Sequence, residues 1–189
     1  MMFPSSKNDE GHSSSENQAD EEQQRSYTTD IPIGFKFKPT DVEIICEYLV
    51  KKATLKLVPP SEIHDINPSD FYNTHPKDLV LRLPDDRSEW YFFIPQNPNE
   101  FKDRIQQGVE GVGYWQFKYN VLIHDRESKP IGNKFEYKFL RTKPQDKPKG
   151  TIWKIDLYEL LQQNIEWIMV KLTKGTNYDG IAGISRDIE

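Results

Sequence analysis

The chain of 189 residues has little of what covalent or metal-based chemistry requires. Cys46 is the only cysteine, which excludes an intrachain disulfide and a thiolate-based zinc site. The four histidines lie far apart, and the sequence has no Gly-x-Ser-x-Gly turn, phosphate-binding glycine loop or His-Glu-x-x-His helix. We therefore expect no metal, no cofactor and no small-molecule substrate, and no motif argues for an enzyme.

Long apolar stretches are also missing. The longest runs, such as Tyr91–Ile94, fall far short of the ~20 residues that cross a bilayer. Residues 1–26 are polar and acidic, so we expect neither a secretory signal nor an Arg-rich transit peptide. No glycosylation acceptor occurs, because Asn67 of the one candidate precedes a proline. These absences indicate a reducing, intracellular compartment and no membrane partner.

The charge is unevenly distributed, although the net charge is only −5. Residues 1–26 carry two basic and six acidic side chains and almost no apolar ones, which predicts a disordered acidic arm over 1–30. Residues 115–154 instead carry ten Lys or Arg and four Asp or Glu, a balance of +6. Such a basic strip is typical of a polyanion-binding surface, but lysines also protect a solvated sheet edge from strand addition. Charge alone leaves both interpretations open.

Apolar residues that recur three and four positions apart predict a helix over 40–52. Thr40 and Glu43 form a Thr-x-x-Glu capping box at its start. The aromatic run Trp90–Ile94 predicts a strand that is buried on both faces. Residues 95–111 are polar and contain two prolines and two glycines, which predicts a long flexible loop.

Later segments alternate with the period of a strand. Over 115–123 the odd positions are apolar or aromatic, so they are expected on one face and the even positions on the other. Three aromatics alternate with Lys or Glu over 134–139, and residues 152–157 group three apolar side chains on one face. Residues 157–169 fit a strand and a helix equally. The predicted fold class is α+β and mainly β, with a twisted antiparallel sheet flanked by a few helices.

The segment Arg141–Gly150 has four cations in ten residues and two prolines that stiffen it. Such cations neutralise backbone phosphates and release counterions, which makes the affinity salt-dependent. A twisted strand edge is also narrow enough to enter the major groove of DNA. Sequence preference would then come from the few residues at the tip of that edge, and not from the lysines.

Several blocks resemble the NAC domain of plant transcription factors, in the order and spacing of that family. The opening block Ile31–Glu43 is similar to Leu-Pro-Pro-Gly-Phe-Arg-Phe-x-Pro-Thr-Asp-Glu-Glu. Two later blocks match the family: Glu89–Phe93 matches Glu-Trp-Tyr-Phe-Phe, and Gly111–Trp115 matches Gly-x-Gly-Tyr-Trp. Two more are similar to it: His75–Leu79 is similar to Pro-Trp-Asp-Leu, and Lys147–Trp153 is similar to Lys-Gly-x-Lys-Thr-x-Trp. The likeness covers about residues 31–172.

The resemblance implies that domain 31–172 is a twisted antiparallel sheet between helices, that it dimerises through its N-terminal part and that a sheet edge binds DNA. In the family, an Arg of the opening block pairs with a Glu of the following helix across the dimer interface. These positions fall on Lys36 and Glu43 here. Lysine keeps the charge but loses the planar fork, so we expect a weaker, more salt-sensitive pair. Capping alone is the other interpretation of Glu43.

The strand that is expected to read DNA departs from the family. After Tyr-Trp the family continues Lys-Ala-Thr-Gly, a small basic tip, whereas this chain has Gln-Phe-Lys-Tyr-Asn over 116–120. Glu110 adds repulsion in the preceding loop. We expect phosphate binding to persist with altered sequence preference. The candidate DNA-binding residues are Arg104, Gln116, Lys118, Asn120, Lys134, Lys138, Lys143, Lys147 and Lys149.

Two functional hypotheses follow from the resemblance. The first is a nuclear, non-enzymatic transcription regulator that binds double-stranded DNA as a homodimer or as a heterodimer with other NAC proteins. The second is an interaction module that heterodimerises with competent relatives and inhibits them without reading DNA itself. The tail 173–189 has neither acidic bulk nor hydrophobic clusters, so we expect no activation capacity from it, whether the chain is a whole product or a fragment.

Overall fold

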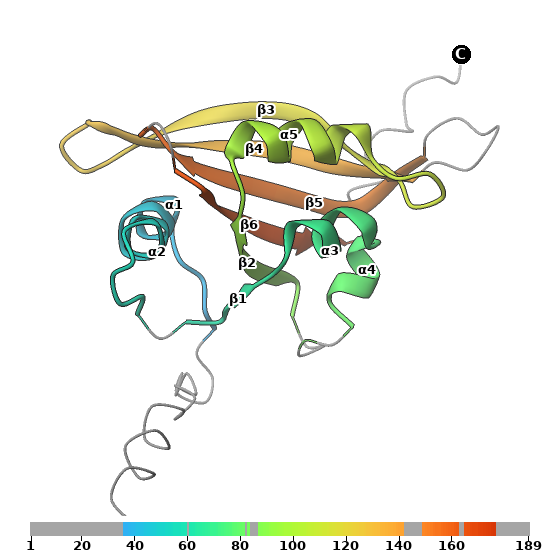
Figure 1. Cartoon of the computed structure of the whole chain (residues 1–189), viewed down its shortest axis with the longest axis horizontal. Coiled ribbons are helices and arrows are strands. Elements are labelled where there is room, and N and C mark those ends of the chain that lie inside the picture. The colour runs from blue at the N-terminus through green and yellow to red at the C-terminus, as the bar shows by residue number, and fades with distance from the viewer. Residues whose placement is uncertain are drawn as a thin grey trace, which may run out of the picture. The chain divides into compact units, whose positions relative to one another are not determined.

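Six strands form one twisted sheet in the computed structural model, which describes residues 36–59, 61–81, 83, 87–141, 149–162 and 165–176. The predicted arm 1–30 and most of the predicted tail lie outside these residues. The strands are β1 (Ile63–Asp65), β2 (Glu89–Pro95), β3 (Tyr114–His124), β4 (Pro130–Arg141), β5 (Lys149–Leu160) and β6 (Trp167–Lys174). Their order across the sheet is β1-β2-β6-β5-β4-β3 (Figure 1), and all neighbours are antiparallel except β1 and β2. The predicted α+β, mainly β fold is confirmed.

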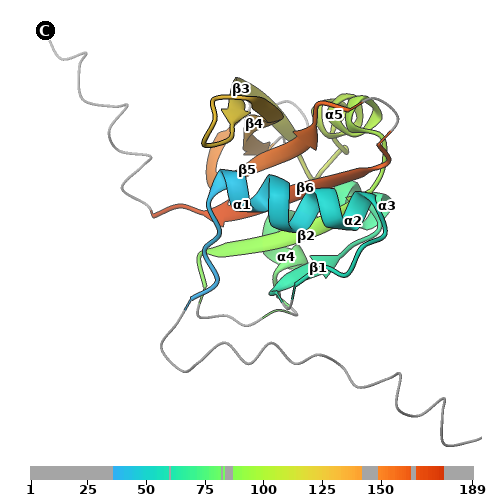
Figure 2. The same cartoon turned by 90° about the vertical axis from the view of Figure 1, so that its left-hand side faces the viewer.

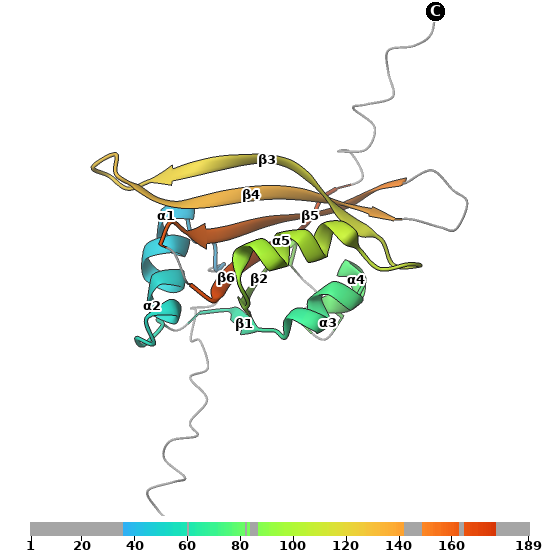
Figure 3. The same cartoon turned by 45° about the horizontal axis from the view of Figure 1, so that its top comes forward.

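Helices cover both faces of the sheet. The helical segments are α1 (Asp41–Glu43), η2 (Ile44–Leu49), α2 (Val50–Ala53), α3 (Pro68–Asn73), α4 (Pro76–Leu79) and α5 (Pro98–Gln107). The first three form one continuous helix that crosses in front of β2, β5 and β6 in Figure 2, and we name this side of the sheet the first face. The other three helices lie on the opposite side, which we name the second face (Figure 3). Phe71 of α3 and Phe101 of α5 are buried there.

The predicted helix over 40–52 and its capping box are confirmed. The Glu43 carboxylate accepts hydrogen bonds from the Thr40 backbone N–H at 2.8 Å and from the Thr40 hydroxyl at 2.9 Å. The Glu43 N–H in turn donates to the Thr40 hydroxyl oxygen, so both side chains satisfy free donors of the first turn. Ile45 and Leu49 are fully buried against the first face, as their spacing predicts. The central turn is π-helical, which the periodicity did not indicate.

The prediction of a long flexible loop over 95–111 is wrong, because α5 occupies most of it. The Asn97 side chain caps this helix by accepting from the Asn99 N–H at 2.9 Å, and a proline fills the first helical position. Phe101 and Ile105, four residues apart, are buried on the second face. Gly108, with φ of +69°, ends the helix. Of the two prolines and two glycines that suggested a loop, Pro98 and Gly108 therefore mark the two ends of a helix.

Within the ambiguous range 157–169, residues 157–160 belong to β5 and residues 167–169 belong to β6. Leu157 and Tyr158 continue β5, and they pair with Val170 and Met169 of β6. All four side chains are buried, because helices cover both faces of the sheet at this point. A strand with two buried faces is continuously apolar and therefore also fits a helical period.

The predicted strict alternation along β3 is wrong beyond its centre. Phe117 lies opposite Tyr137 of β4, but Tyr119 lies opposite Glu136, so Lys118 is one extra residue in the outer strand. An inserted residue of this kind is a β-bulge, and it exchanges the faces of every side chain that follows. A period of two in the sequence does not show where such a residue is inserted.

The bulge separates residues that were predicted on one side. Trp115 precedes it and packs on the second face, whereas Ile123 follows it and packs on the first. Asn120 now lies opposite Phe135, one of the three β4 aromatics whose predicted common face is confirmed. The two ends of β3 are therefore buried on opposite faces of the sheet.

Asp41 ties the start of the long helix to the first face of the sheet. One carboxylate oxygen accepts a hydrogen bond from the Tyr158 hydroxyl at 2.7 Å, and the other pairs with the Lys134 ammonium group. Partial burial raises the pKa of Asp41, but these two hydrogen bonds outweigh it, and the pKa lies below its ordinary value. The ionised carboxylate is therefore the form that the folded structure stabilises.

Replacing Asp41 by Asn keeps the shape of the side chain and removes the charge that faces Lys134. We expect a loss of about 1.5 kcal/mol in the free energy of unfolding, the low end for hydrogen bonds to charged groups because the carboxylate is partly exposed, read as a lower urea midpoint. The contribution is complete above pH 3.8, the ordinary pKa of this carboxyl, and is lost as the pH falls through the lower folded value. The difference between the two proteins should therefore close in acid.

Glu47→Gln is the matched control, because the exposed Glu47 lies on the same helix and, among the described residues, its one ion pair is with Lys51 four residues on. A surface pair of this kind contributes about 0.3–0.5 kcal/mol. Equal losses in the two variants would contradict the anchoring role of Asp41.

Candidate nucleic-acid interface

The outer strand β3 is paired on one side only, with β4. Trp115 and Ile123 are its buried residues, and all seven residues between them are exposed. Four of these are large and apolar or aromatic, namely Phe117, Tyr119, Val121 and Leu122. The predicted DNA-reading segment thus lies along a free sheet edge, where both faces and one backbone edge are accessible.

Lysines gather on the half of the first face that the long helix leaves open. Gln116, Lys138 and Lys154 lie side by side on β3, β4 and β5. Lys118, at the bulge, donates a hydrogen bond to the Gln116 side chain. We name these four residues the open basic patch. Three cations of the sequence strip are therefore on one surface, next to the free edge.

The other predicted DNA-binding residues are dispersed. Arg104 is on α5, where its guanidinium group lies 5.8 Å from the centre of the Tyr72 ring. Asn120 lies on the second face of the sheet, opposite Phe135, and Lys134 forms an ion pair with Asp41. Lys149 is exposed at the start of β5, opposite Arg141 of β4. Lys143 and Lys147 lie outside the described residues.

Lys154 was missed as a site residue from the sequence. It is exposed between the buried Trp153 and Ile155, so strand alternation places it on the opposite face from both. The alternation could be read from the sequence. That Lys154 lies next to Lys138 could not, because it depends on the register of β4 and β5.

A row of acidic and tyrosine side chains borders the patch on the first face. Glu136 accepts a hydrogen bond from the Tyr119 hydroxyl at 2.8 Å, and Asp156 follows on β5. Asp156 is buried and pairs with Lys171 of β6 at 2.8 Å. Burial lowers the pKa of Lys171, but Asp156 outweighs this effect and the pKa is raised, so the ammonium form persists. The charge of Asp156 is thus balanced within the sheet, whereas Glu136 has no such cation opposite it among its strand partners.

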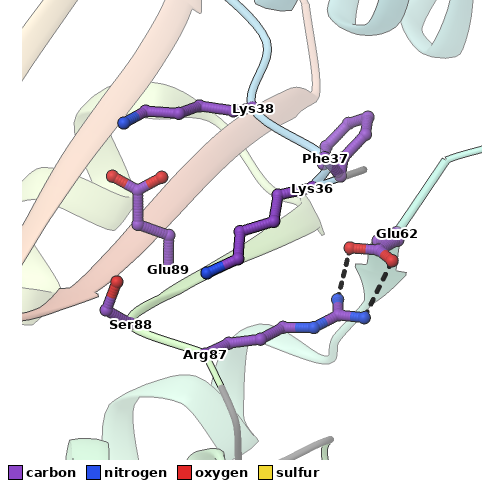
Figure 4. A pocket seen from close by; sticks show the side chains of 7 residues that line it. All are labelled: Lys36, Phe37, Lys38, Glu62, Arg87, Ser88 and Glu89. Carbon is purple, nitrogen blue, oxygen red and sulfur yellow. Dashed lines mark hydrogen bonds and ion pairs between the residues drawn. The ribbon is translucent and has the colours of Figure 1, made fainter. Parts of the chain in front are cut away.

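Lys36 lines a cavity of about 240 Å³ beside the first residue of β2 (Figure 4). The lining residues are Lys36, Phe37, Lys38, Glu62, Arg87, Ser88 and Glu89. Arg87 and Glu62 form a two-point ion pair there, and Lys36 points toward Ser88 (Figure 4). The salt bridges of the described residues do not join Lys36 to Glu43, whose carboxylate turns back to Thr40. Glu43 thus caps the helix as predicted, and its pairing with Lys36 across a dimer stays a prediction.

Other types of site were sought in the part of the chain that the structure describes. That part contains no group of three His, Cys, Asp or Glu side chains arranged to hold a metal ion. None of its helices is long and apolar enough to cross a membrane.

Comparison with known proteins decides the family. The family model described as "No apical meristem (NAM) protein" matches residues 32–160. The chain belongs to this NAC family. It is 35% identical over 137 residues to NAC transcription factor 47 of Arabidopsis thaliana. The matched region covers 69% of this chain and 36% of that protein. It is 33% identical over 136 residues to NAC domain-containing protein 1 of Solanum lycopersicum, covering 70% and 46%. The chain thus spans less than half the length of these relatives.

Gly113 fixes the start of the outer strand in this NAC domain. Its φ is +138°, and an added Cβ would lie 2.4 Å from the Leu140 carbonyl oxygen and 2.7 Å from the Phe139 ring. Gly111 also has a positive φ, +77°, but an added Cβ there would meet nothing within 4 Å. Backbone strain is therefore common to both positions, and close packing occurs only at Gly113.

Gly113→Ala should destabilise the domain by about 3 kcal/mol or more, because strain and a clash with backbone combine. Gly111→Ala should cost only the strain, about 1 kcal/mol. Urea unfolding followed by tryptophan fluorescence compares them, and equal losses would show that the close contacts of Gly113 do not matter.

Proposed function

We propose that this NAC domain is a transcription regulator without catalytic activity, which acts in the nucleus and binds double-stranded DNA as a dimer. The observation that carries the proposal is the open basic patch beside the free edge of β3. The name of the Arabidopsis thaliana relative, NAC transcription factor 47, supports the same class of function.

Phosphate neutralisation is the part of this function that the patch supports most directly. Lys138 and Lys154 lie opposite each other on neighbouring strands, and strands are about 4.8 Å apart. No ion pair is formed by either lysine within the described residues. Two adjacent like charges without an acidic partner repel each other, and a polyanion relieves that repulsion.

Altered base reading follows from the shape of the strand tip. Phe117 and Tyr119 are 42% and 49% exposed, and the bulge at Lys118 directs them to opposite faces of β3. A small tip can approach base edges closely, whereas two bulky rings keep the backbone at a distance from the groove floor. We infer that the domain binds the family's core site with less preference over other duplexes.

Gel-shift titration with the core-site duplex and scrambled duplexes tests both inferences. The wild-type domain should bind all of them with similar affinity, and Lys138→Gln/Lys154→Gln should weaken binding to each about equally. Each lost phosphate contact should reduce the slope of log K against log salt by about 0.9.

Lys56→Gln is the control, because Lys56 is exposed after α2 and lies outside the patch. It should leave affinity and slope unchanged. Undiminished preference for the core site would refute the altered reading, and binding that is insensitive to Lys138 and Lys154 would refute the interface.

The dimer is proposed to pair Lys36 with Glu43 of a second subunit. Both side chains are exposed, and the capping bonds use one carboxylate oxygen of Glu43, so the other is open to a partner. Lys36→Glu should shift the domain toward monomer in sedimentation velocity, and the added Glu43→Lys exchange should restore the dimer. Failure of the double exchange to restore it, with unchanged thermal stability, would refute this pairing.

The second candidate function is heterodimerisation with relatives that read DNA, which this chain would inhibit. The observation that favours it is the engagement of Lys134 by Asp41, together with the aromatic tip, because both reduce the DNA-reading surface. The gel shift distinguishes the two: a domain that binds no duplex alone, but lowers the binding of a competent NAC relative, has the second function.

A further inference from the structure

Tyr119 has the most exposed aromatic ring of the outer strand. Its exposed fraction is 49%, and no other ring of the described residues packs against it. Phe117 differs, because its ring packs edge-on against Tyr137 with centroids 5.6 Å apart and also contacts Phe135. Tyr119 is thus the ring on β3 whose flat surface is open.

The orientation of this ring is fixed at its polar end. The Tyr119 hydroxyl donates to the Glu136 carboxylate at 2.8 Å, across the β3–β4 pairing. Glu136 lies on the same face as Lys138, two residues further along β4. The ring is therefore held on the first face, beside the open basic patch.

A positioned aromatic ring next to cations is a combination that binds unpaired bases. Stacking needs a base with a free flat surface, and every base of a single strand has one, whereas neighbours cover both surfaces within a duplex. Cations beside the ring bind the phosphates that flank the stacked base. In duplex binding the Tyr119 ring acts only through its bulk, and its open flat surface is not used.

We propose that the open basic patch also binds single-stranded nucleic acid, with one base stacked on Tyr119 and neighbouring phosphates on Lys138 and Lys154. This inference rests on the proposed function, because the same lysines bind the duplex. It adds a ligand class, unpaired nucleotides, and a stacking residue.

The test is fluorescence anisotropy with two labelled probes, an oligothymidylate of about 15 nucleotides, which is within the site sizes of single-strand binders, and a mixed-sequence duplex. Tyr119→Leu removes the ring and keeps apolar bulk, and it should weaken oligothymidylate binding roughly ten-fold. Duplex binding should change less than two-fold. Tyr119→Phe keeps the ring and should retain most of the single-strand affinity.

Val121→Ala is the control, because Val121 is on the same strand and 42% exposed, and it should change neither affinity. Equal effects of Tyr119→Leu and Tyr119→Phe, or equal losses on both probes, would overturn the stacking proposal. A wild-type domain that binds duplex but not oligothymidylate would overturn this inference alone. A domain that binds neither probe would overturn the proposed function as well.

Discussion

The one-sided attachment of β3 determines what this domain presents to a partner. Pairing with β4 and the buried side chains of Trp115 and Ile123 hold the strand, and everything between those two residues is exposed. Natural sheets protect such edges with charge or with bulges. Here Lys118 supplies both the charge and the bulge. The neighbouring aromatic side chains of Phe117 and Tyr119 remain exposed. An edge that discourages strand addition in this way is still open to a ligand that approaches side chains.

The first face is divided by the anchoring of the long helix. Asp41 binds Lys134 and Tyr158, so the helix covers that half of the sheet and consumes one cation of the basic strip. Lys138, which is half-buried, and the exposed Lys154 form no ion pair within the described residues. The cations of residues 115–154 therefore do not all lie on one free surface: Lys134 pairs with Asp41, whereas Lys138 and Lys154 belong to the open basic patch.

Local patterns predicted the local features of this fold. The capping box of Thr40 and Glu43 and the aromatic side of β4 depend on residues a few positions apart, and both were readable from the sequence. Helix α5 was missed because its Asn97 cap and Gly108 end were interpreted as loop residues. The bulge at Lys118 and the neighbourhood of Lys138 and Lys154 depend on pairing between strands, which periodicity along one strand does not contain.

Affinity and sequence preference are physically separable at a surface of this kind. Attraction between lysines and phosphates acts over a Debye length of about 8 Å at physiological salt and does not depend on the base sequence. Contacts to base edges act only within hydrogen-bond distance, so the bulk of Phe117 and Tyr119 affects them first. Glu136 moderates the attraction locally while it orients Tyr119. In this proposal the lysines determine whether nucleic acid binds, and the aromatic tip determines which form of it binds best.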